Sequence, residues 1–261
     1  MDRICVHGLN VRETDVGDYD KIITLVTQEY GKLTVTGKGV KSLKSKNMVG
    51  CQPFAYSVYH LKKSKKFWYV EETELIDCFF GLRGDLNRLS LAAYICDVLA
   101  DVSVENAPET EALRLTLNML YAISNKPDIP LQKIKATFEL RCAAELGFCP
   151  ELSACDVCGC DVKNDNIYLD VMNGRLLCAD CKPRAEKEEE RIEGSARLYY
   201  ILSADVVFAM RYIISAPVGK VLSYTLDEDG TYLLGKVCEG YLVNHLEHPF
   251  STLDFYKSIL I

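Results

Sequence analysis

The sequence predicts an α+β protein of several modules: a small N-terminal β-barrel, then an all-α domain into which a four-cysteine module is inserted. Three observations lead to this fold class. Residues 1–79 hold β-branched and aromatic runs between turn residues, residues after about 80 follow helical spacing, and two C-x-x-C pairs follow residue 150. We place the modules at 1–79 (barrel), 80–152 (helical, first part), 153–183 (cysteine module) and 184–261 (helical, second part).

Five β-strands are expected in the first module. The first is marked by Ile4 and Val6 and precedes turn residues at 15–18. The other four are expected at residues 22–27, 33–36, 54–61 and 67–75. A turn at 29–32 joins the second and third strands, a lysine-rich turn at 62–66 joins the fourth and fifth, and a polar connector spans 40–50. Five strands with two hairpins and one longer connector are typical of an OB-type barrel.

The rest of the chain, apart from the cysteine module, has the apolar spacing of helices. Helices are expected at about 82–96, 108–120, 128–147, 195–216 and 226–246. Asp128 and Ser195 are the expected caps of the third and fourth helices. The charged stretch 185–193 is expected to be a solvated helix or a linker.

Composition narrows the class of protein. Hydrophobic residues make up 49% of the chain, as in globular proteins with a core, and no secretory signal or membrane-spanning run is recognised, so a soluble, cytoplasmic protein is expected. Residues 1–70 carry a formal charge of +6 and the remainder −13, which together give the net −7. A basic module joined to an acidic body favours a polyanionic ligand at one end and protein partners elsewhere.

Two C-x-x-C pairs predict a metal site. Nineteen residues separate the pair Cys155 and Cys158, which is followed by Gly159, from the pair Cys178 and Cys181, and four thiolates on two tight turns suit one structural Zn²⁺ ion. Strands at 167–171 and 175–177 would form a zinc-ribbon hairpin. A disulfide pair or a redox C-x-x-C are the alternatives. Four cysteine ligands close the metal shell, so catalysis by the metal is not expected.

The other eight cysteines are expected to be reduced thiols in or near the core. They are Cys5, Cys51, Cys78, Cys96, Cys142, Cys149, Cys160 and Cys238. Cys160 lies two residues after Cys158 and could compete for the metal, but the regular C-x-x-C spacing leaves it as a bystander. His245 and His248 are three residues apart, which does not match the H-E-x-x-H motif, so they are expected to belong to a polar helix end.

Lysines gather in two segments of the barrel module. These candidate DNA-binding residues are Lys38, Lys41, Lys44 and Lys46 in one loop, and Lys62, Lys63, Lys65 and Lys66 in the other. Aromatic residues that could stack on bases lie in the adjacent strands: Phe54, Tyr56, Tyr59, Phe67, Trp68 and Tyr69. About half of these rings should be core residues, because strand side chains alternate between faces. We find no phosphate-binding loop, nucleophile motif or paired carboxylates, so no catalytic residue is predicted.

Several segments resemble a known family, in the family's order. They are D-K-I-I-T-L-V-T at 20–27, G-K-G-V-K at 37–41, Q-P-F at 52–54, F-E-L-R at 138–141 with Gly147, C-x-x-C-G at 155–159, and the final 241–255 region. Together they resemble the bacterial recombination mediator family RecO along nearly the whole chain. Lys41 stands where the family pattern usually has arginine, which keeps the charge but loses bidentate phosphate geometry.

The resemblance implies a function and partners. Members of this family are non-enzymatic proteins with an N-terminal OB fold, a helical domain and a zinc module. They bind single- and double-stranded DNA, anneal complementary strands, and act with RecR to place RecA on strands coated by single-stranded DNA-binding protein, whose C-terminal tail is a further partner. The loop lysines at 38–46 match the family's basic loop, whereas those at 62–66 are supported by charge alone. Because some members lack the four cysteines, the zinc ion is expected to stabilise the fold.

Two other classes of function stay open. The chain could be another nucleic-acid-binding protein with an OB fold and a zinc ribbon, acting on RNA or in transcription. It could instead be a protein-interaction adaptor whose lysines only keep it in solution. Sequence-independent binding of single-stranded DNA with strand annealing would favour the first reading, and absence of salt-dependent DNA binding would favour the adaptor.

Overall fold

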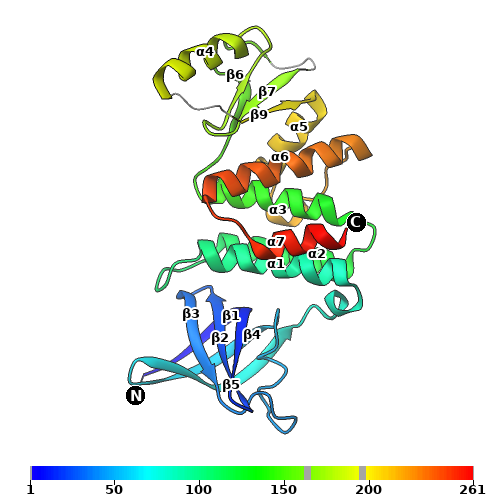
Figure 1. Ribbon diagram of the computed structural model, residues 1–261. Helices are drawn as coiled ribbons and strands as arrows, with labels where there is room; N and C mark the ends of the chain where they lie inside the picture. The colour runs from blue at the N-terminus through cyan, green and yellow to red at the C-terminus, as the bar shows by residue number, and fades with distance from the viewer. Residues whose placement is uncertain (1, 162–165, 194–197, 261) are drawn as a thin grey trace. The chain divides into compact units, whose positions relative to one another are not determined.

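The computed structural model describes residues 2–161, 166–193 and 198–260 (Figure 1). The chain divides into two compact units, Met1–Ile129 with Phe250–Ile261, and Pro130–Pro249. Within the described residues, no helix is both long and apolar enough to cross a membrane. Each unit is described separately below.

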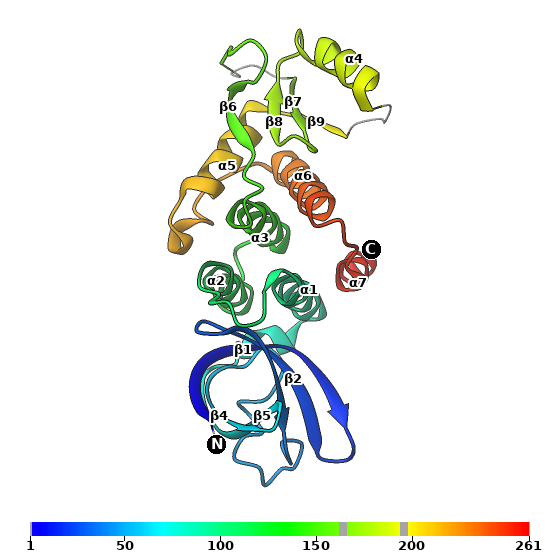
Figure 2. The same cartoon turned by 90° about the vertical axis from the view of Figure 1, so that its left-hand side faces the viewer.

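The first unit contains a closed five-stranded barrel in the order β1-β2-β3-β5-β4. Its strands are β1 (Arg3–Val16), β2 (Asp20–Thr27), β3 (Gly31–Gly37), β4 (Tyr56–Ser64) and β5 (Phe67–Asp77). Neighbouring strands are antiparallel except β3 and β5, whose short parallel pairing closes the barrel (Figure 2). The predicted OB-like barrel is confirmed. The first strand is longer than predicted, because it pairs with β2 as far as Val16.

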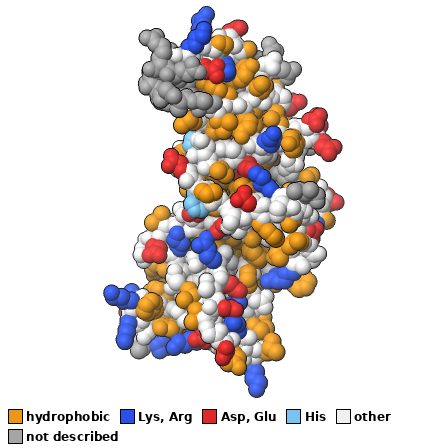
Figure 3. Space-filling model, in the orientation of Figure 1, with side chains coloured by type: hydrophobic (Ala, Val, Ile, Leu, Met, Phe, Trp, Pro, Cys, Tyr) orange, Lys and Arg blue, Asp and Glu red, His pale blue; other side chains and the backbone are white. Residues whose placement is uncertain are grey.

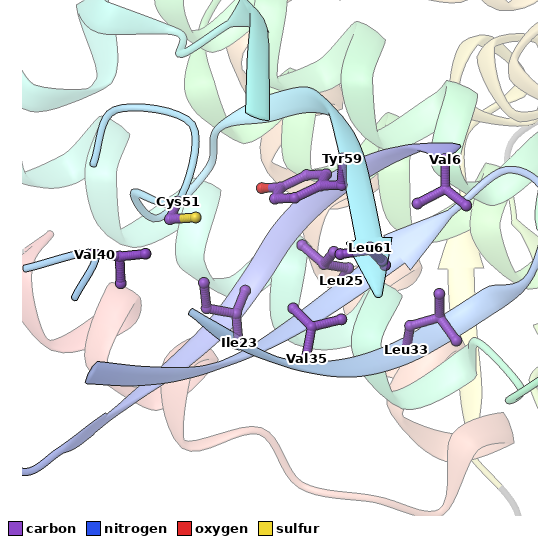
Figure 4. Packing of buried hydrophobic residues seen from close by; sticks show 9 residues of the cluster. All are labelled: Val6, Ile23, Leu25, Leu33, Val35, Val40, Cys51, Tyr59 and Leu61. Atoms are coloured by element: carbon purple, nitrogen blue, oxygen red, sulfur yellow. The ribbon is translucent and has the colours of Figure 1, made fainter. Parts of the chain in front are cut away.

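Alternation along the strands builds the barrel core. The residues that point inward in Figure 4 are Val6, Ile23, Leu25, Leu33, Val35, Val40, Cys51, Tyr59 and Leu61. They include Val40 and Cys51 from the β3–β4 connector, so this connector is anchored to the barrel by buried side chains. Tyr59 is fully buried, and its hydroxyl donates a hydrogen bond of 2.6 Å to the Gly50 carbonyl. This hydrogen bond ties the end of the connector to β4.

Helices complete the first unit. They are the 3-10 helix η1 (Phe80–Gly84), α1 (Leu86–Val102), α2 (Glu111–Asn125) and α7 (Ser251–Ile259). Asp85 caps α1, where its carboxylate accepts from the Asn87 and Arg88 amides. The helix α7 packs against α1, with a hydrogen bond of 2.9 Å from the Thr252 hydroxyl to Asp97. The helix α1 therefore begins four residues later than predicted, because residues 80–84 form η1 and Asp85 caps α1.

The second unit combines helices with a small sheet. The helices are α3 (Leu131–Glu145), α4 (Lys182–Glu193), α5 (Ala204–Ser215) and α6 (Glu228–Leu246), with a 3-10 turn η2 (Val218–Lys220). The strands β6 (Glu151–Cys155), β7 (Ile167–Asp170), β8 (Arg175–Leu177) and β9 (Tyr199–Leu202) form a sheet in the order β6-β8-β7-β9. The predicted hairpin is confirmed as β7 and β8, and the charged stretch forms α4.

One predicted helix is wrong in its first part. The expected cap Ser195 lies outside the described residues, and residues 199–202 form the strand β9, paired with β7, rather than a helix. The run Tyr-Tyr-Ile-Leu favours a strand, and the helix begins only after Ser203, whose hydroxyl accepts from the Val206 amide. Asp128 is likewise not the cap of α3, which follows Pro130 instead.

Buried charges join α3 to α6 in this unit. Lys135, with a side chain only 5% exposed, forms ion pairs of 2.8 Å with the fully buried Glu139 and 2.7 Å with Glu239. A buried charge without a partner is costly, so these three residues depend on one another.

Candidate functional site

Five thiols meet at the edge of the small sheet and are called the thiol cluster below. They are Cys155 at the end of β6, Cys158 and Cys160 in the segment after it, and Cys178 and Cys181 between β8 and α4. The Sγ atoms of Cys155, Cys158, Cys160 and Cys178 all lie within 4.8 Å of one another. The thiol of Cys181 is within hydrogen-bonding reach of those of Cys178, Cys158 and Cys155. The structure thus brings three of the four predicted ligands into one group with Cys160, and the fourth, Cys181, lies beside that group.

Backbone geometry shapes the first knuckle. The amide of Gly159 donates to the Cys155 carbonyl at 2.8 Å, and Gly159 has a φ of +69°, which favours glycine at this position. The Cys178 amide donates to the Cys155 sulfur at 3.3 Å. Burial raises the pKa of Cys155, but hydrogen bonds to its sulfur from the amides of Cys178, Cys158 and Val157 outweigh this effect and bring the pKa to about 6. An amide aimed at a sulfur stabilises the thiolate, which is the form that binds metals.

The donor set fits a tetrahedral metal ion with thiolate ligands. A zinc–sulfur bond of about 2.3 Å in a tetrahedron requires ligand sulfurs to lie about 3.8 Å apart. The sulfurs of Cys158 and Cys178, which come from different knuckles, are 3.9 Å apart. The cluster is therefore spaced to hold a metal ion without rearrangement of these two ligands, and soft thiolates suit zinc.

His245, near the end of α6, and His248, which follows that helix, do not belong to the metal-binding group. His245 stacks on Phe148 at 4.9 Å between ring centroids and lies 4.3 Å from the ring of Tyr241. Burial lowers its pKa, against a backbone hydrogen bond at Val171 that raises it. His245 is therefore a packed side chain, and among the described residues the metal-binding group consists of cysteines alone.

The lysines of the β3–β4 loop differ in their surroundings. Lys41 forms an ion pair of 2.8 Å with Asp15, whose pKa is lowered by this hydrogen bond. Lys44 and Lys46 are exposed and, within the part of the chain that the structure describes, have no ion-pair partner. Lys38 is exposed, and its Nζ lies 4.9 Å from the ring centroid of Tyr69. Three of the four loop lysines therefore keep their charge available to a ligand.

The lysines of the β4–β5 hairpin also differ in their surroundings. Lys62 lies 3.7 Å from Glu71, which also pairs with Arg3, and Lys63 lies 5.3 Å from the ring centroid of Trp68. Lys65 and Lys66 form the exposed two-residue turn between Ser64 and Phe67. On the face drawn in Figure 3, basic side chains gather over the barrel, at the bottom of the view.

The aromatic residues of the barrel include both buried and exposed rings, as expected when successive strand side chains point to opposite faces. Tyr59 and Phe54 are buried, and Trp68 packs against the barrel core, so these rings are structural. Phe67 is 63% exposed, and Tyr69 is partly exposed. The surface rings are thus two residues apart on β5.

Strand register connects the two lysine segments. Tyr69 pairs with Lys62 of β4 on one side and with Thr36 of β3 on the other, and Lys38 covers its ring. We call Lys38, Lys62, Phe67 and Tyr69 the β5 surface. The sequence alone did not show that one tyrosine would lie between both lysine segments, because this depends on the parallel closure of β3 with β5. The acidic partners Asp15 and Glu71 were also missed, and no sequence signal paired them with Lys41 and Lys62.

An OB-like barrel carrying lysines and aromatic rings, joined to helices and a cysteine module, defines a multi-module protein of the nucleic-acid-binding type. The comparison with protein families is more specific. Residues 1–79 match the family model "Recombination protein O N terminal" and residues 83–254 match "Recombination protein O C terminal". The chain therefore belongs to the RecO family.

Curated relatives match this chain along nearly its full length. The chain is 31% identical over 259 residues to the DNA repair protein RecO of Acetivibrio thermocellus, covering 99% of this chain and 98% of the relative. It is 26% identical to the DNA repair protein RecO of Alkaliphilus metalliredigens, covering 98% of this chain and 99% of that protein. The family supports a role in DNA repair and recombination.

Proposed function

We propose that this protein is a non-enzymatic recombination mediator that binds and anneals single-stranded DNA. In this role it acts with RecR to load RecA onto strands coated by single-stranded DNA-binding protein. The observation that carries the proposal is the β5 surface, where the ammonium group of Lys38 lies over the ring of Tyr69 and Lys62 is the cross-strand neighbour of that tyrosine. An ammonium group beside a partly exposed ring matches the two requirements for binding single strands, which are phosphate neutralisation and base stacking.

The two lysine segments are proposed to contact phosphates. Lys38, Lys44 and Lys46 supply free charges from the β3–β4 loop, and Lys65 and Lys66 supply them from the hairpin turn. Displacement of condensed counterions from the DNA would provide much of the affinity. Neither lysines nor stacked rings read base edges, so binding would be independent of sequence, as annealing of any complementary pair requires.

Backbone strain at the hairpin supports a role for its charge. Lys65 has a φ of +55°, in the left-handed region, where glycine or asparagine is the usual residue of a two-residue turn. A lysine there costs about 1 kcal/mol. A charged side chain kept at a strained turn is consistent with a contact made by that charge.

The thiol cluster is proposed to hold one structural zinc ion through Cys155, Cys158, Cys178 and Cys181. Zinc would join the segment after β6 to the start of α4 and so stabilise the small sheet. Because a shell of four thiolates has no open position, the metal would have no catalytic role.

Protein partners are proposed for the acidic part of the chain, where residues 71–261 carry a formal charge of −13. RecR and the C-terminal tail of single-stranded DNA-binding protein would bind there, with RecA affected indirectly. The modules would be 1–79 for DNA, 153–183 for zinc, and 80–152 with 184–261 for the helical body. The site of action would be the bacterial cytoplasm, at the nucleoid.

The test is annealing of two complementary, mixed-sequence oligonucleotides, followed by a quenched fluorophore pair. We expect the protein to accelerate annealing without ATP, and a variant with Lys38, Lys44 and Lys46 changed to glutamine to lose most of this acceleration. The control changes three exposed lysines outside the barrel, Lys126, Lys220 and Lys236, and so has the same net charge.

Each outcome separates the classes of function. Annealing that survives in the loop variant but not in the control would move the DNA site out of the barrel. Preference for RNA over single-stranded DNA in competition would favour an RNA-binding protein. If no nucleic acid binds at low salt, the mediator proposal fails and an adaptor takes its place.

A further inference from the structure

Cys160 is the fifth thiol of the cluster and lies outside both C-x-x-C pairs. It belongs to the group of sulfurs that all lie within 4.8 Å of one another, together with Cys155, Cys158 and Cys178. Cys181 approaches the same three thiols but stands outside that group. Three thiols are thus shared by two possible sets of four, and the sets differ only in their last member.

Local backbone structure holds Cys160 near the cluster. The chain reverses at Gly159, whose φ is +69°, and the Cys155 amide then donates to the Cys160 carbonyl at 3.0 Å. This hydrogen bond closes the loop formed by residues 155–160. Cys160 is therefore fixed beside the shared thiols by the same turn that forms the first knuckle.

We propose that this protein binds its metal through three constant ligands, Cys155, Cys158 and Cys178, with Cys160 and Cys181 as alternative fourth ligands. The proposal rests on the zinc centre proposed above. Zinc in a structural site takes four ligands, so one of the five cysteines stays unbound. In the exchange, one zinc–sulfur bond breaks and another forms. The incoming thiol gives up its proton and the released thiolate takes one up, so the net charge of the site is unchanged.

The two alternative ligands stand in different surroundings. Cys160 is exposed, whereas Cys181 is only 6% exposed and its carbonyl accepts from the Ala185 amide at 3.0 Å in the first turn of α4. Bound through Cys181, the metal holds the start of α4 to the sheet. Bound through Cys160, the metal keeps its shell complete without α4. A site of this kind retains zinc when either cysteine is removed.

The first test measures zinc content and cobalt spectra of the full chain and its variants. The variants are Cys160→Ser, Cys181→Ser and the double variant, with Cys149→Ser as a control for an exposed cysteine of the same unit. We expect each single variant to hold one zinc ion per chain. In each, the thiolate-to-cobalt charge-transfer band should match that of the parent. The double variant should bind zinc more than about tenfold more weakly, because one of four ligands is missing.

The outcomes separate this proposal from the zinc centre itself. A parent protein that binds neither zinc nor cobalt would overturn both. If Cys181→Ser loses zinc as fully as the double variant, Cys160 is a bystander and the alternation is wrong. If Cys160→Ser alone loses zinc, or if the double variant keeps it, the shared-ligand arrangement is also wrong.

A second measurement uses the parent protein and does not depend on the folding of any variant. The zinc-loaded chain is alkylated with iodoacetamide, and the modified cysteines are mapped by mass spectrometry. Exchange between the two ligands predicts modification at both Cys160 and Cys181, with Cys155, Cys158 and Cys178 protected. Modification confined to Cys160, with Cys181 fully protected, would refute the exchange.

Discussion

The salt dependence of DNA binding is the prediction that the structure makes most quantitative. The perturbation replaces Lys38, Lys44 and Lys46 by glutamine and leaves Lys41 in place. Lys41 is kept because its ammonium group is already paired with Asp15 at 2.8 Å, so it should displace few counterions. The other three loop lysines have no ion-pair partner among residues 2–161, 166–193 and 198–260, so each should contribute fully.

The magnitude follows from these free charges. Each lysine that neutralises a phosphate of single-stranded DNA contributes about 0.7 to the slope of log affinity against log salt concentration. Three lysines therefore contribute about 2.1, so the slope of the variant should be smaller by about 2. Between 50 and 200 mM salt, the affinity ratio of parent to variant should fall about 20-fold. Changing Asp15 to asparagine releases Lys41 and should steepen the parent slope by about 0.7.

Fluorescence anisotropy of a labelled, mixed-sequence single strand measures these slopes directly. The charge-matched control, with Lys126, Lys220 and Lys236 changed to glutamine, should keep the parent slope. An unchanged slope in the loop variant would refute the assignment of the β3–β4 loop and direct attention to Lys65 and Lys66. An equal loss of slope in the control would show that net charge alone governs binding.

Three further predictions concern the stability of the two units. Changing Tyr59 to phenylalanine removes the 2.6 Å hydrogen bond to the Gly50 carbonyl and leaves it only the 3.4 Å bond from the Ser57 hydroxyl, and should lower the free energy of unfolding by about 0.5–1.5 kcal/mol in urea denaturation. Lys135→Met leaves the carboxylate of Glu139 buried beside an uncharged side chain, and should cost about 3–5 kcal/mol, whereas the exposed control Lys126→Met should change the urea midpoint little. Burial lowers the pKa of His245 below its ordinary 6.5, so protonation favours the unfolded chain. The stability that neutral His245 contributes is fully present above the unfolded-state pKa of 6.5 and is lost as pH falls through the lower folded-state pKa. On acidification, the urea midpoint of His245→Phe should therefore fall less than that of the parent protein, and an equal fall would contradict this.

Much of the barrel could be predicted from sequence, because local patterns determine it. Alternating apolar residues and the position of the lysine-rich turn give the strands, and the buried Tyr59 and exposed Phe67 follow from alternation. The two C-x-x-C pairs likewise indicate a cysteine cluster that could hold a metal ion, since metal ligands on tight turns have a fixed spacing. What could not be predicted depends on contacts between distant residues. The position of Tyr69 between Lys38 and Lys62 requires the closure of β3 with β5, which leaves no local signal.

The sequence-based predictions that failed in the second unit failed for a similar physical reason. Residues 199–202 form too short a run for spacing to distinguish a strand from a helix, and their pairing with β7 makes them a strand. Cys160 was predicted to be a bystander by spacing alone, whereas the turn at Gly159 brings its sulfur among the predicted ligands. A turn with a positive φ changes the direction of the chain, and spacing rules do not record that change.

The pairing of lysines with acids changes how the charge of the barrel module should be interpreted. The formal +6 of residues 1–70 treats all lysines alike, yet Lys41 is held by Asp15 and Lys62 is near Glu71. Ion pairs of this kind at the surface contribute little to stability, so their stronger effect is on binding, where they reduce the charge offered to phosphates. DNA affinity should therefore follow the number of unpaired lysines rather than the net charge. Removing an acid such as Asp15 should strengthen binding more than adding a lysine remote from the β5 surface.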